Sequence, residues 1–223
     1  MQETINRRDR RKNARAVEPI MKKRFDQHLA VIVFFLVSLF GSLLYADSSP
    51  LEQFKNQLAS LQQVLNDPKL AGADHLVQRR NLAKVILREI FDFDEMARRS
   101  LGRNARTYSN RLGEFTPLFV DILERSYMGI IEDNGDAKIQ YDKEFTDGKF
   151  GEINTKAKLK NSKEVTMNYK LMTTSSRWQV YDVVIEGISI VNNYRSQFER
   201  VLNKRSFDEL LQDLRDKKNS SKQ

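Results

Sequence analysis

Residues 178–198, WQVYDVVIEGISIVNNYRSQF, decide the fold, because a β-rich run passes through one glycine and becomes a helical pattern without a long loop. In the first half, apolar side chains occupy both alternating sets of positions, which predicts a central strand covered on both faces. Gly187 then permits a bend, and apolar residues follow at helical spacing, at Ile188, Val191, Tyr194, Phe198 and Leu202. The pattern predicts a strand that delivers a helix back onto its own sheet.

The chain before residue 134 carries helical patterns, in which apolar residues recur every three or four positions. Helices are expected over residues 50–65, 76–90 and 115–131. The apolar pattern of the second helix includes Leu82 and Val85, and the broad apolar face of the third predicts that it lies flat against a sheet. Asp92 and Glu95 have the spacing of a capping box, which predicts a further helix beginning there.

Beyond Asn134 and Gly135, which form a turn signal, the apolar period changes from that of a helix to two. The alternation predicts strands near residues 138–142, 153–160, 165–171 and 178–185. An antiparallel meander of about four strands accounts for this order, with a solvated face on the outer strands. Because helices come first, strands next and a helix last, the sequence predicts an α+β fold rather than a doubly wound parallel sheet.

The first 46 residues have the features of a leader and signal peptide. Lys22, Lys23 and Arg24 precede an apolar run over residues 29–45, and Ala46 is followed by polar, turn-forming residues. A run this short, with small residues near its end, suits signal peptidase better than a stop-transfer helix, so cleavage is expected after Ala46. An uncleaved membrane anchor is the alternative. Residues 1–20 are polar and basic, and translation that begins at Met21 is a second reading of this segment.

Length and charge describe the remainder of the chain. With 223 residues and no cysteine, the chain can bury a core without disulfides, and one domain is predicted over residues 47–216, with a disordered tail at 217–223. The formal net charge is +8, but residues 1–46 hold nine Lys or Arg and four Asp or Glu, so only three of the excess positive charges lie beyond them. A domain so close to neutral does not favour nucleic acid as a partner.

Residues suited to catalysis are scarce. His75 is the only histidine beyond the leader, and Gly187-Ile188-Ser189 lacks the second glycine of a nucleophile elbow. Asp92 and Asp94 can pair as carboxylates, but helix capping explains the first and solvent exposure the second. No sequence cluster has the spacing of metal ligands. We therefore predict no catalytic residue, no metal site and no cofactor.

Asp182 and Glu186 stand near the end of the strand predicted over residues 178–185. Two carboxylates at such a place can form a polar site. A structural partner such as Arg195 or Arg200 is the favoured interpretation of both.

Four stretches together resemble a known family: FDFDEMARRSLG at 91–102, FVDILERSYMGII at 119–131, the segment at 178–198, and FDELLQDL at 207–214. Their order is similar to that of the MlaC family of periplasmic phospholipid-binding proteins, also called the toluene-tolerance family. The resemblance covers nearly all of the chain beyond the leader. The chain departs from the family pattern between Gly102 and Phe115, where an aromatic residue and a Thr-Pro-Glu helix start are more usual.

The resemblance implies a non-catalytic periplasmic carrier of a glycerophospholipid. Such a carrier passes its lipid between an outer-membrane lipoprotein complex and an inner-membrane ABC transporter with a lipid-binding periplasmic subunit, and so maintains outer-membrane lipid asymmetry. The lipid is cargo rather than a cofactor. The alternative is a membrane-anchored, cone-shaped α+β domain with an unidentified enzymatic or protein-binding role.

Acyl chains then need an apolar pocket between helices and sheet, although periodicity by itself does not distinguish such a pocket from an ordinary core. Under the family reading we expect the lining to consist of Phe93, Met96, Phe119, Leu123, Tyr127, Met167, Tyr169, Val183 and Ile185. Tyr127 and Tyr169 are expected to turn their hydroxyls toward the glycerol or phosphate at the mouth. Lys160 and Lys163, together with the basic tail at Lys217 and Lys218, are the candidates for docking on the membrane complexes.

Overall fold

The computed structural model describes residues 49–174 and 177–220. These residues form one compact unit. The leader predicted at residues 1–46 and its cleavage before Asp47 lie outside the described residues. None of the described helices is long and apolar enough to cross a membrane.

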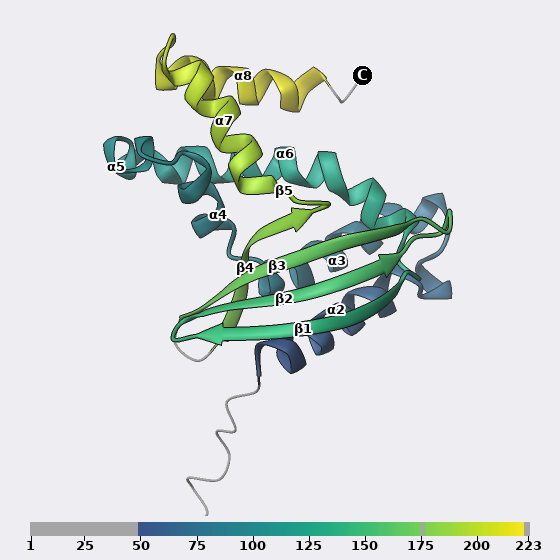
Figure 1. The fold of residues 1–223 in the computed structure, drawn as a ribbon. Helices are drawn as coiled ribbons and strands as arrows, with labels where there is room; N and C mark the ends of the chain where they lie inside the picture. The colour runs from purple at the N-terminus through teal and green to yellow at the C-terminus, as the bar shows by residue number, and fades with distance from the viewer. Residues whose placement is uncertain (1–48, 175–176, 221–223) are drawn as a thin grey trace, which may run out of the picture. The chain divides into compact units, whose positions relative to one another are not determined.

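The strands form one antiparallel sheet in the order β1-β2-β3-β4-β5 (Figure 1). They are β1 (Lys138–Asp147), β2 (Phe150–Lys158), β3 (Glu164–Thr174), β4 (Arg177–Ile185) and the two-residue β5 (Ile188–Ser189). Each strand pairs with the next one along the chain, so the predicted meander and the α+β class are confirmed. The fifth strand is the short return after Gly187.

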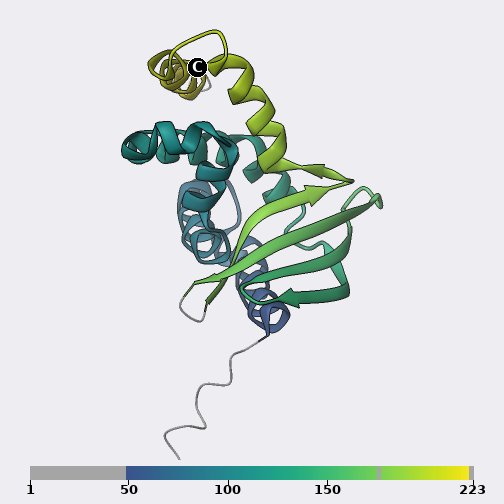
Figure 2. The same ribbon diagram turned by 60° about the vertical axis from the view of Figure 1, so that its left-hand side comes forward.

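The helices lie on one side of the sheet in the described part of the chain and leave its other face uncovered (Figure 2). They are α2 (Pro50–Leu65), α3 (Leu76–Ile90), α4 (Phe93–Ser100), α5 (Asn104–Thr107), α6 (Leu112–Asp133), α7 (Ile190–Leu202) and α8 (Phe207–Ser220), with short 3-10 turns at Pro68–Leu70, Ala73–His75 and Ser109–Arg111. The uncovered face exposes aromatic side chains such as Phe145 and Phe150.

Strand β4 does not have the central position that its sequence predicted. It pairs with β3 along its length but with β5 only at its end. The connection between α3 and α4 covers the rest of that edge, because the backbone N–H of Asp92 donates to the carbonyl of Val180 (2.9 Å). The side chain of Gln53 on α2 bonds both backbone groups of Trp178 (2.6 and 3.1 Å). Helical segments, rather than a further long strand, satisfy the outer edge of β4.

The passage from β4 into α7 is a tight hairpin followed by a capped helix. Glu186 and Gly187 both have positive φ angles, 49° and 80°, as a two-residue type I′ turn requires. Ser189 is the N-cap of α7, and its Oγ accepts from the N–H of Asn192 (3.0 Å). The predicted strand-to-helix passage is therefore present, with β5 inserted between the two elements.

The C-terminal helix α8 continues to Ser220, so the prediction of a disordered tail from residue 217 is wrong for its first four residues. Side chains of α6 hold this end in place. The ammonium of Lys218 pairs with Asp121, and Arg125 Nη1 donates to the carbonyl of Lys217 (3.1 Å). The sequence alone did not reveal these contacts because the partners lie more than ninety residues apart.

An aromatic cluster joins α6, α7 and α8. Phe115 and Phe119 on α6 lie one turn apart with their rings stacked at 5.9 Å, and both rings contact Phe198 on α7 (5.4 and 6.1 Å). Phe207 at the start of α8 adds a further ring, 6.1 Å from Phe115. This cluster anchors α6 to the other helices, and α6 accordingly packs on α4 and α8 more than on any strand.

Candidate functional site

An almost entirely apolar cavity of about 200 Å³ lies between the helices and the inner face of the sheet. Its lining consists of Leu87, Phe91, Phe93, Met96, Leu123, Glu124, Tyr127, Met128, Ile130, Ile131, Met167, Tyr169, Val183, Ile185 and Ile190. Since α6 is held mainly by α4 and α8, it passes over the strands without packing tightly into them. The cavity occupies the space that this arrangement leaves.

The strand side of the cavity follows from the register between β3 and β4. Met167 is paired with Ile185 and Tyr169 with Val183, in consecutive positions on one face of the sheet. Side chains directly opposite one another on such a face are close neighbours. The antiparallel pairing therefore gathers these four predicted residues into one wall.

The helix side consists mainly of α4 and α6. Leu123 and Tyr127 are one turn apart on α6, so their side chains share a face. Met96 comes from α4, where Asp92 is the N-cap and its carboxylate accepts from the N–H of Glu95 (2.9 Å). The predicted cap is confirmed, but Glu95 does not complete a capping box, because its carboxylate bonds Arg98 and Arg99 instead.

The two tyrosines of the lining differ in their surroundings. Tyr169 is only 8% exposed, its hydroxyl donates to the thioether of Met167 (3.6 Å), and its ring lies 4.5 Å from that of Phe54. Burial strongly raises the pKa of Tyr169. The expectation that its hydroxyl faces the mouth is wrong, because the side chain belongs to the inner wall. Tyr127 is half-buried, and burial also raises its pKa.

The structure brings eight of the nine predicted lining residues to this cavity. Phe119 is the exception. Its side chain is fully buried in the aromatic cluster and its ring makes an edge contact with Tyr194 at 5.3 Å. Each step of four residues turns a side chain about 40° around the helix axis, so Phe119, eight positions before Tyr127, faces α7 while Tyr127 faces the cavity.

Sequence reasoning missed seven lining residues: Leu87, Phe91, Glu124, Met128, Ile130, Ile131 and Ile190. Ile131 was detectable, because it stands one turn after Tyr127 on the same face of α6. Phe91 lies between two helices, and its bridge to Val180 on β4 depends on the tertiary fold. No local pattern indicated that contact.

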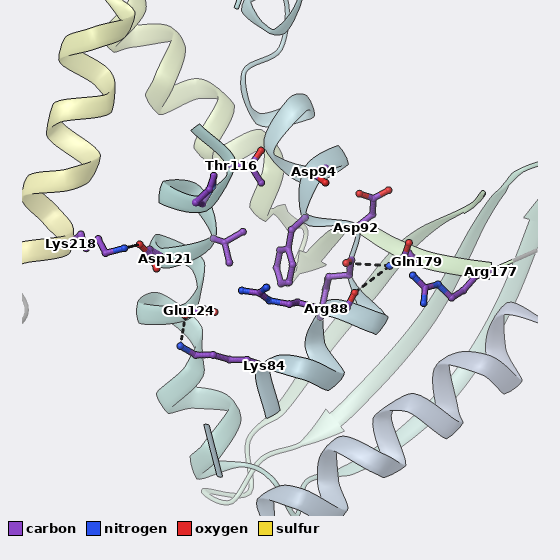
Figure 3. A pocket seen from close by; sticks show the side chains of 14 residues that line it. Lys84, Arg88, Asp92, Asp94, Thr116, Asp121, Glu124, Arg177, Gln179 and Lys218 are labelled. Carbon is purple, nitrogen blue, oxygen red and sulfur yellow. Dashed lines mark hydrogen bonds and ion pairs between the residues drawn. The ribbon is translucent and has the colours of Figure 1, made fainter. Parts of the chain in front are cut away.

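A larger polar cleft of about 580 Å³ adjoins the cavity (Figure 3). Its lining consists of Lys84, Arg88, Phe91, Asp92, Phe93, Asp94, Thr116, Pro117, Val120, Asp121, Glu124, Arg177, Gln179 and Lys218. The cleft and the cavity share Phe91, Phe93 and Glu124, and the rings of the two phenylalanines are stacked at 5.7 Å. These three residues form the boundary between an apolar chamber and a charged one.

The other predicted polar residues have structural contacts. Asp182 is buried, and it accepts from Ser189 Oγ (2.6 Å) and from the N–H of Val191 (3.1 Å) rather than from an arginine. Glu186 Oε1 accepts from the N–H of Thr166 (2.6 Å). Among the described residues, no group of three or more His, Asp or Glu side chains is placed to hold a metal ion.

Lys160 and Lys163, the predicted docking residues, are exposed between β2 and β3. The backbone N–H of Lys160 donates to Asn134 Oδ1 (3.0 Å), which places this turn beside the end of α6. Ile130 and Ile131 of the cavity lie on the last turn of that helix. The role of both lysines in docking stays a prediction.

The model of the MlaC protein family matches residues 55–216. Among solved structures, a phospholipid-binding protein from Ralstonia solanacearum, in complex with a phospholipid, is similar to this chain with a TM-score of 0.66. The two share 21% sequence identity, and the match covers 76% of this chain and 96% of that chain, so the likeness establishes the fold. None of the curated proteins compared with the chain matches it.

Proposed function

The chain belongs to the MlaC family, and from this membership we propose that it is a phospholipid carrier whose acyl chains occupy the apolar cavity under α6. The observation that carries the proposal is the lining: apart from Glu124, every residue around the cavity is apolar or aromatic. Burial of acyl methylenes contributes about 0.8 kcal/mol each, so an apolar wall can retain a lipid without specific polar contacts. Such a wall favours binding over catalysis.

The size of the cavity implies that its walls move when lipid enters. Small-molecule sites measure roughly 300–1,000 Å³, whereas this cavity measures about 200 Å³. Met96, Met128 and Met167 lie in its wall, and unbranched thioether side chains adapt to varied shapes. We therefore expect α6 to separate from β3 and β4 as acyl chains enter.

The finer role belongs to the same proposal. The carrier receives its lipid from one membrane and delivers it to another, with an outer-membrane lipoprotein complex and an inner-membrane ABC transporter as partners. Lys160 and Lys163, exposed beside the end of α6, are the proposed docking residues. Family membership and the basic-apolar leader support a periplasmic location.

Export is tested by the mass of the mature protein. Cleavage after Ala46 predicts an N-terminus at Asp47. Intact-mass measurement of the protein from a periplasmic extract checks this, and full-length protein found only in the membrane fraction would favour the anchored alternative.

Lipid binding is tested by filling the cavity. We expect detergent-free wild-type protein to release phospholipid on organic extraction, as measured by mass spectrometry. Leu123→Trp places an indole in the space that the acyl chains would occupy, and it should reduce the bound lipid at least about tenfold, which corresponds to about 1.4 kcal/mol. Val77→Trp is the matched control, because Val77 is 71% exposed on α3.

Two results would overturn the proposal: folded wild-type protein that never carries lipid, and unchanged lipid in folded Leu123→Trp. Circular dichroism establishes that each variant is folded. Equal lipid in the wild type and in Val77→Trp is required for the comparison to hold.

A further inference from the structure

The cleft beside the cavity contains charges that the acyl chains do not need. We propose that it is the phosphate subsite of the carried lipid, with Lys84 and Arg88 of α3 as the residues that bind the phosphate oxygens. The inference rests on the proposed function, because it places the phosphate next to a cavity that holds the acyl chains. It goes further in naming a polar site and the chemistry that the site recognises.

Position is the first argument. The cavity and the cleft meet at Phe91, Phe93 and Glu124, so a molecule with an apolar part and a charged part can occupy both without crossing the sheet. Lys84 and Arg88 are four residues apart on α3 and both line the cleft. Figure 3 shows their side chains extending from α3 toward α6, where Glu124 lies. Residues at this spacing are neighbours on a helix surface.

The charges of the cleft are the second argument. Four cations and four carboxylates line it, and two ion pairs join members of the two sets: Lys84 Nζ lies 2.7 Å from Glu124 Oε2, and Lys218 pairs with Asp121. Among the described residues, the guanidinium of Arg88 has no carboxylate within ion-pair distance. An arginine in the cleft that adjoins the apolar cavity can offer a phosphate two parallel N–H donors.

Hydrogen bonds from β4 hold the backbone that carries Arg88. Gln179 of β4 directs its amide nitrogen at the carbonyls of Arg88 and Glu89 (both 3.4 Å) and of Phe91 (3.5 Å), which fixes the end of α3 against the sheet (Figure 3). A guanidinium on a fixed helix end loses less freedom on binding than one on a loop. Arg88 is therefore the better anchor of the pair.

Lys84 contributes without leaving Glu124. Its ammonium has three donors, and the ion pair with Glu124 uses one of them. Glu124 is only 19% exposed and faces the apolar cavity, where the ammonium of Lys84 offsets the charge of its carboxylate. Lys84 thus neutralises the carboxylate at the boundary and still faces the cleft, where a phosphate oxygen can bind.

The balance of charges sets the specificity. Because carboxylates and cations are equal in number, the cleft has no net charge that would favour an anionic head group over a zwitterionic one. Selection should therefore depend on the phosphate itself. Phosphatidylethanolamine and phosphatidylglycerol should bind about equally, and a diacylglycerol with the same acyl chains should bind less well.

Competition between lipids with and without phosphate tests the subsite. Full-length protein is incubated with octyl glucoside micelles that hold equal amounts of dioleoylphosphatidylethanolamine and dioleoylglycerol, and the detergent is then removed. Mass spectrometry of the extracted lipid gives the ratio bound. We expect wild type to favour the phospholipid about tenfold or more. The diacylglycerol lacks the charge-assisted contact, and the absence of one such contact typically lowers affinity by this factor. A parallel mixture with phosphatidylglycerol should give a similar ratio.

Arg88→Gln removes the main phosphate contact and should bring the ratio close to one, because the phospholipid loses a contact that the diacylglycerol never makes. Arg200→Gln is the matched control. Arg200 is exposed in the last turn of α7, as Arg88 is in the last turn of α3, but it lies outside the cleft. Its ratio should equal that of wild type. A double variant, Lys84→Met with Glu124→Gln, removes the ion pair without leaving a lone buried carboxylate and should lower the ratio severalfold.

The outcomes separate the two proposals. If wild type binds neither lipid, the proposed function fails. If wild type binds both equally, or if Arg88→Gln keeps the full preference, only the phosphate subsite fails. Thermal unfolding in inorganic phosphate and in chloride, at equal ionic strength, tests whether the cleft is instead a site for free phosphate. Stabilisation by phosphate that depends on Arg88, without any lipid preference, would overturn the assignment to lipid.

Discussion

Asp182 connects three segments where β4 ends and α7 begins. Its carboxylate accepts from Ser189 Oγ and from the N–H of Val191. Ser189 Oγ in turn accepts from the N–H of Asn192 and so caps α7. Two of the four free N–H groups at the start of α7 are therefore satisfied by a buried acid and a serine that it orients. The same helix carries Ile190 to the wall of the cavity.

Replacing this carboxylate should destabilise the protein. We expect Asp182→Ala to lower the free energy of unfolding by about 1–3 kcal/mol, because the half-buried hydroxyl of Ser189 and the buried N–H of Val191 lose their acceptor. Urea unfolding measures the change. Asp147→Ala, at an exposed position of β1, should change the midpoint little. An equal loss in both variants would mean that these hydrogen bonds contribute nothing specific.

The sequence predicted most residues of the cavity wall, because the pattern of apolar and polar positions shows which side chains share one face of a strand or helix. Alternation places Met167 and Tyr169 on one face of β3, and the pairing with β4 then follows from the meander. Phe119 shows the limit of that reasoning. A helix buried on several sides has more than one apolar face, and the partner of each face is decided by neighbouring helices far away in the sequence.

Helix α8 begins with a capping box. Ser206 Oγ accepts from the N–H of Glu209 (3.2 Å), and Glu209 Oε2 accepts from the N–H of Ser206 (2.9 Å). The backbone hydrogen bond from Ser206, followed by the hydrogen bond from Arg205, lowers the pKa of Glu209 to about 2. The helix that carries Lys218 to the cleft thus begins at a charged cap.

The pKa of Glu209 predicts how stability depends on pH. Because the folded value of about 2 lies below the ordinary value of 4.5, the contribution of this carboxylate is complete above about pH 4.5 and is lost as the pH falls toward 2. Glu209→Gln should therefore lower the Tm at pH 7, and the difference from wild type should shrink below pH 4.5. Thermal unfolding from pH 7 to pH 3 checks this. A difference that does not change with pH would contradict a role for the charge.

Helix α3 shows why an element can be predicted while its orientation is not. Its bounds follow the apolar pattern, yet Leu82 and Val85 are 42% and 59% exposed, and the buried residues are Ala83, Leu87 and Ile90. The helix is fixed by contacts outside it, including ion pairs from Arg80 and Lys84 to Glu132 and Glu124 on α6. Long-range contacts of this kind rotate a weakly amphipathic helix about its axis.

At the scale of the whole molecule, the architecture separates a part that holds its shape from a part that can open. The aromatic cluster around Phe115 fixes α6 to α7 and α8. The cavity lies where α6 passes over the inner face of β3 and β4, and the uncovered outer face of the sheet allows the strands to bend (Figure 2). Opening therefore requires a change mainly between one helix and two strands, without disruption of the aromatic cluster.

Removal of the lipid should then act on one region rather than on the whole protein. Ligand that binds only the folded state raises stability by mass action, so delipidated protein should have a lower Tm than loaded protein, and added phospholipid should restore it. Amide exchange should become faster at cavity-lining positions of α6, β3 and β4, while α8 keeps its protection.

Leu123→Trp provides the control, since a filled cavity should make Tm and exchange rates independent of lipid. If exchange rises equally across α8 and the cavity wall, the lipid stabilises the entire domain and α6 does not move alone. If the Tm of delipidated wild type equals that of loaded protein, the cavity does not bury the acyl chains, because burial of so much apolar surface must appear in the free energy of unfolding.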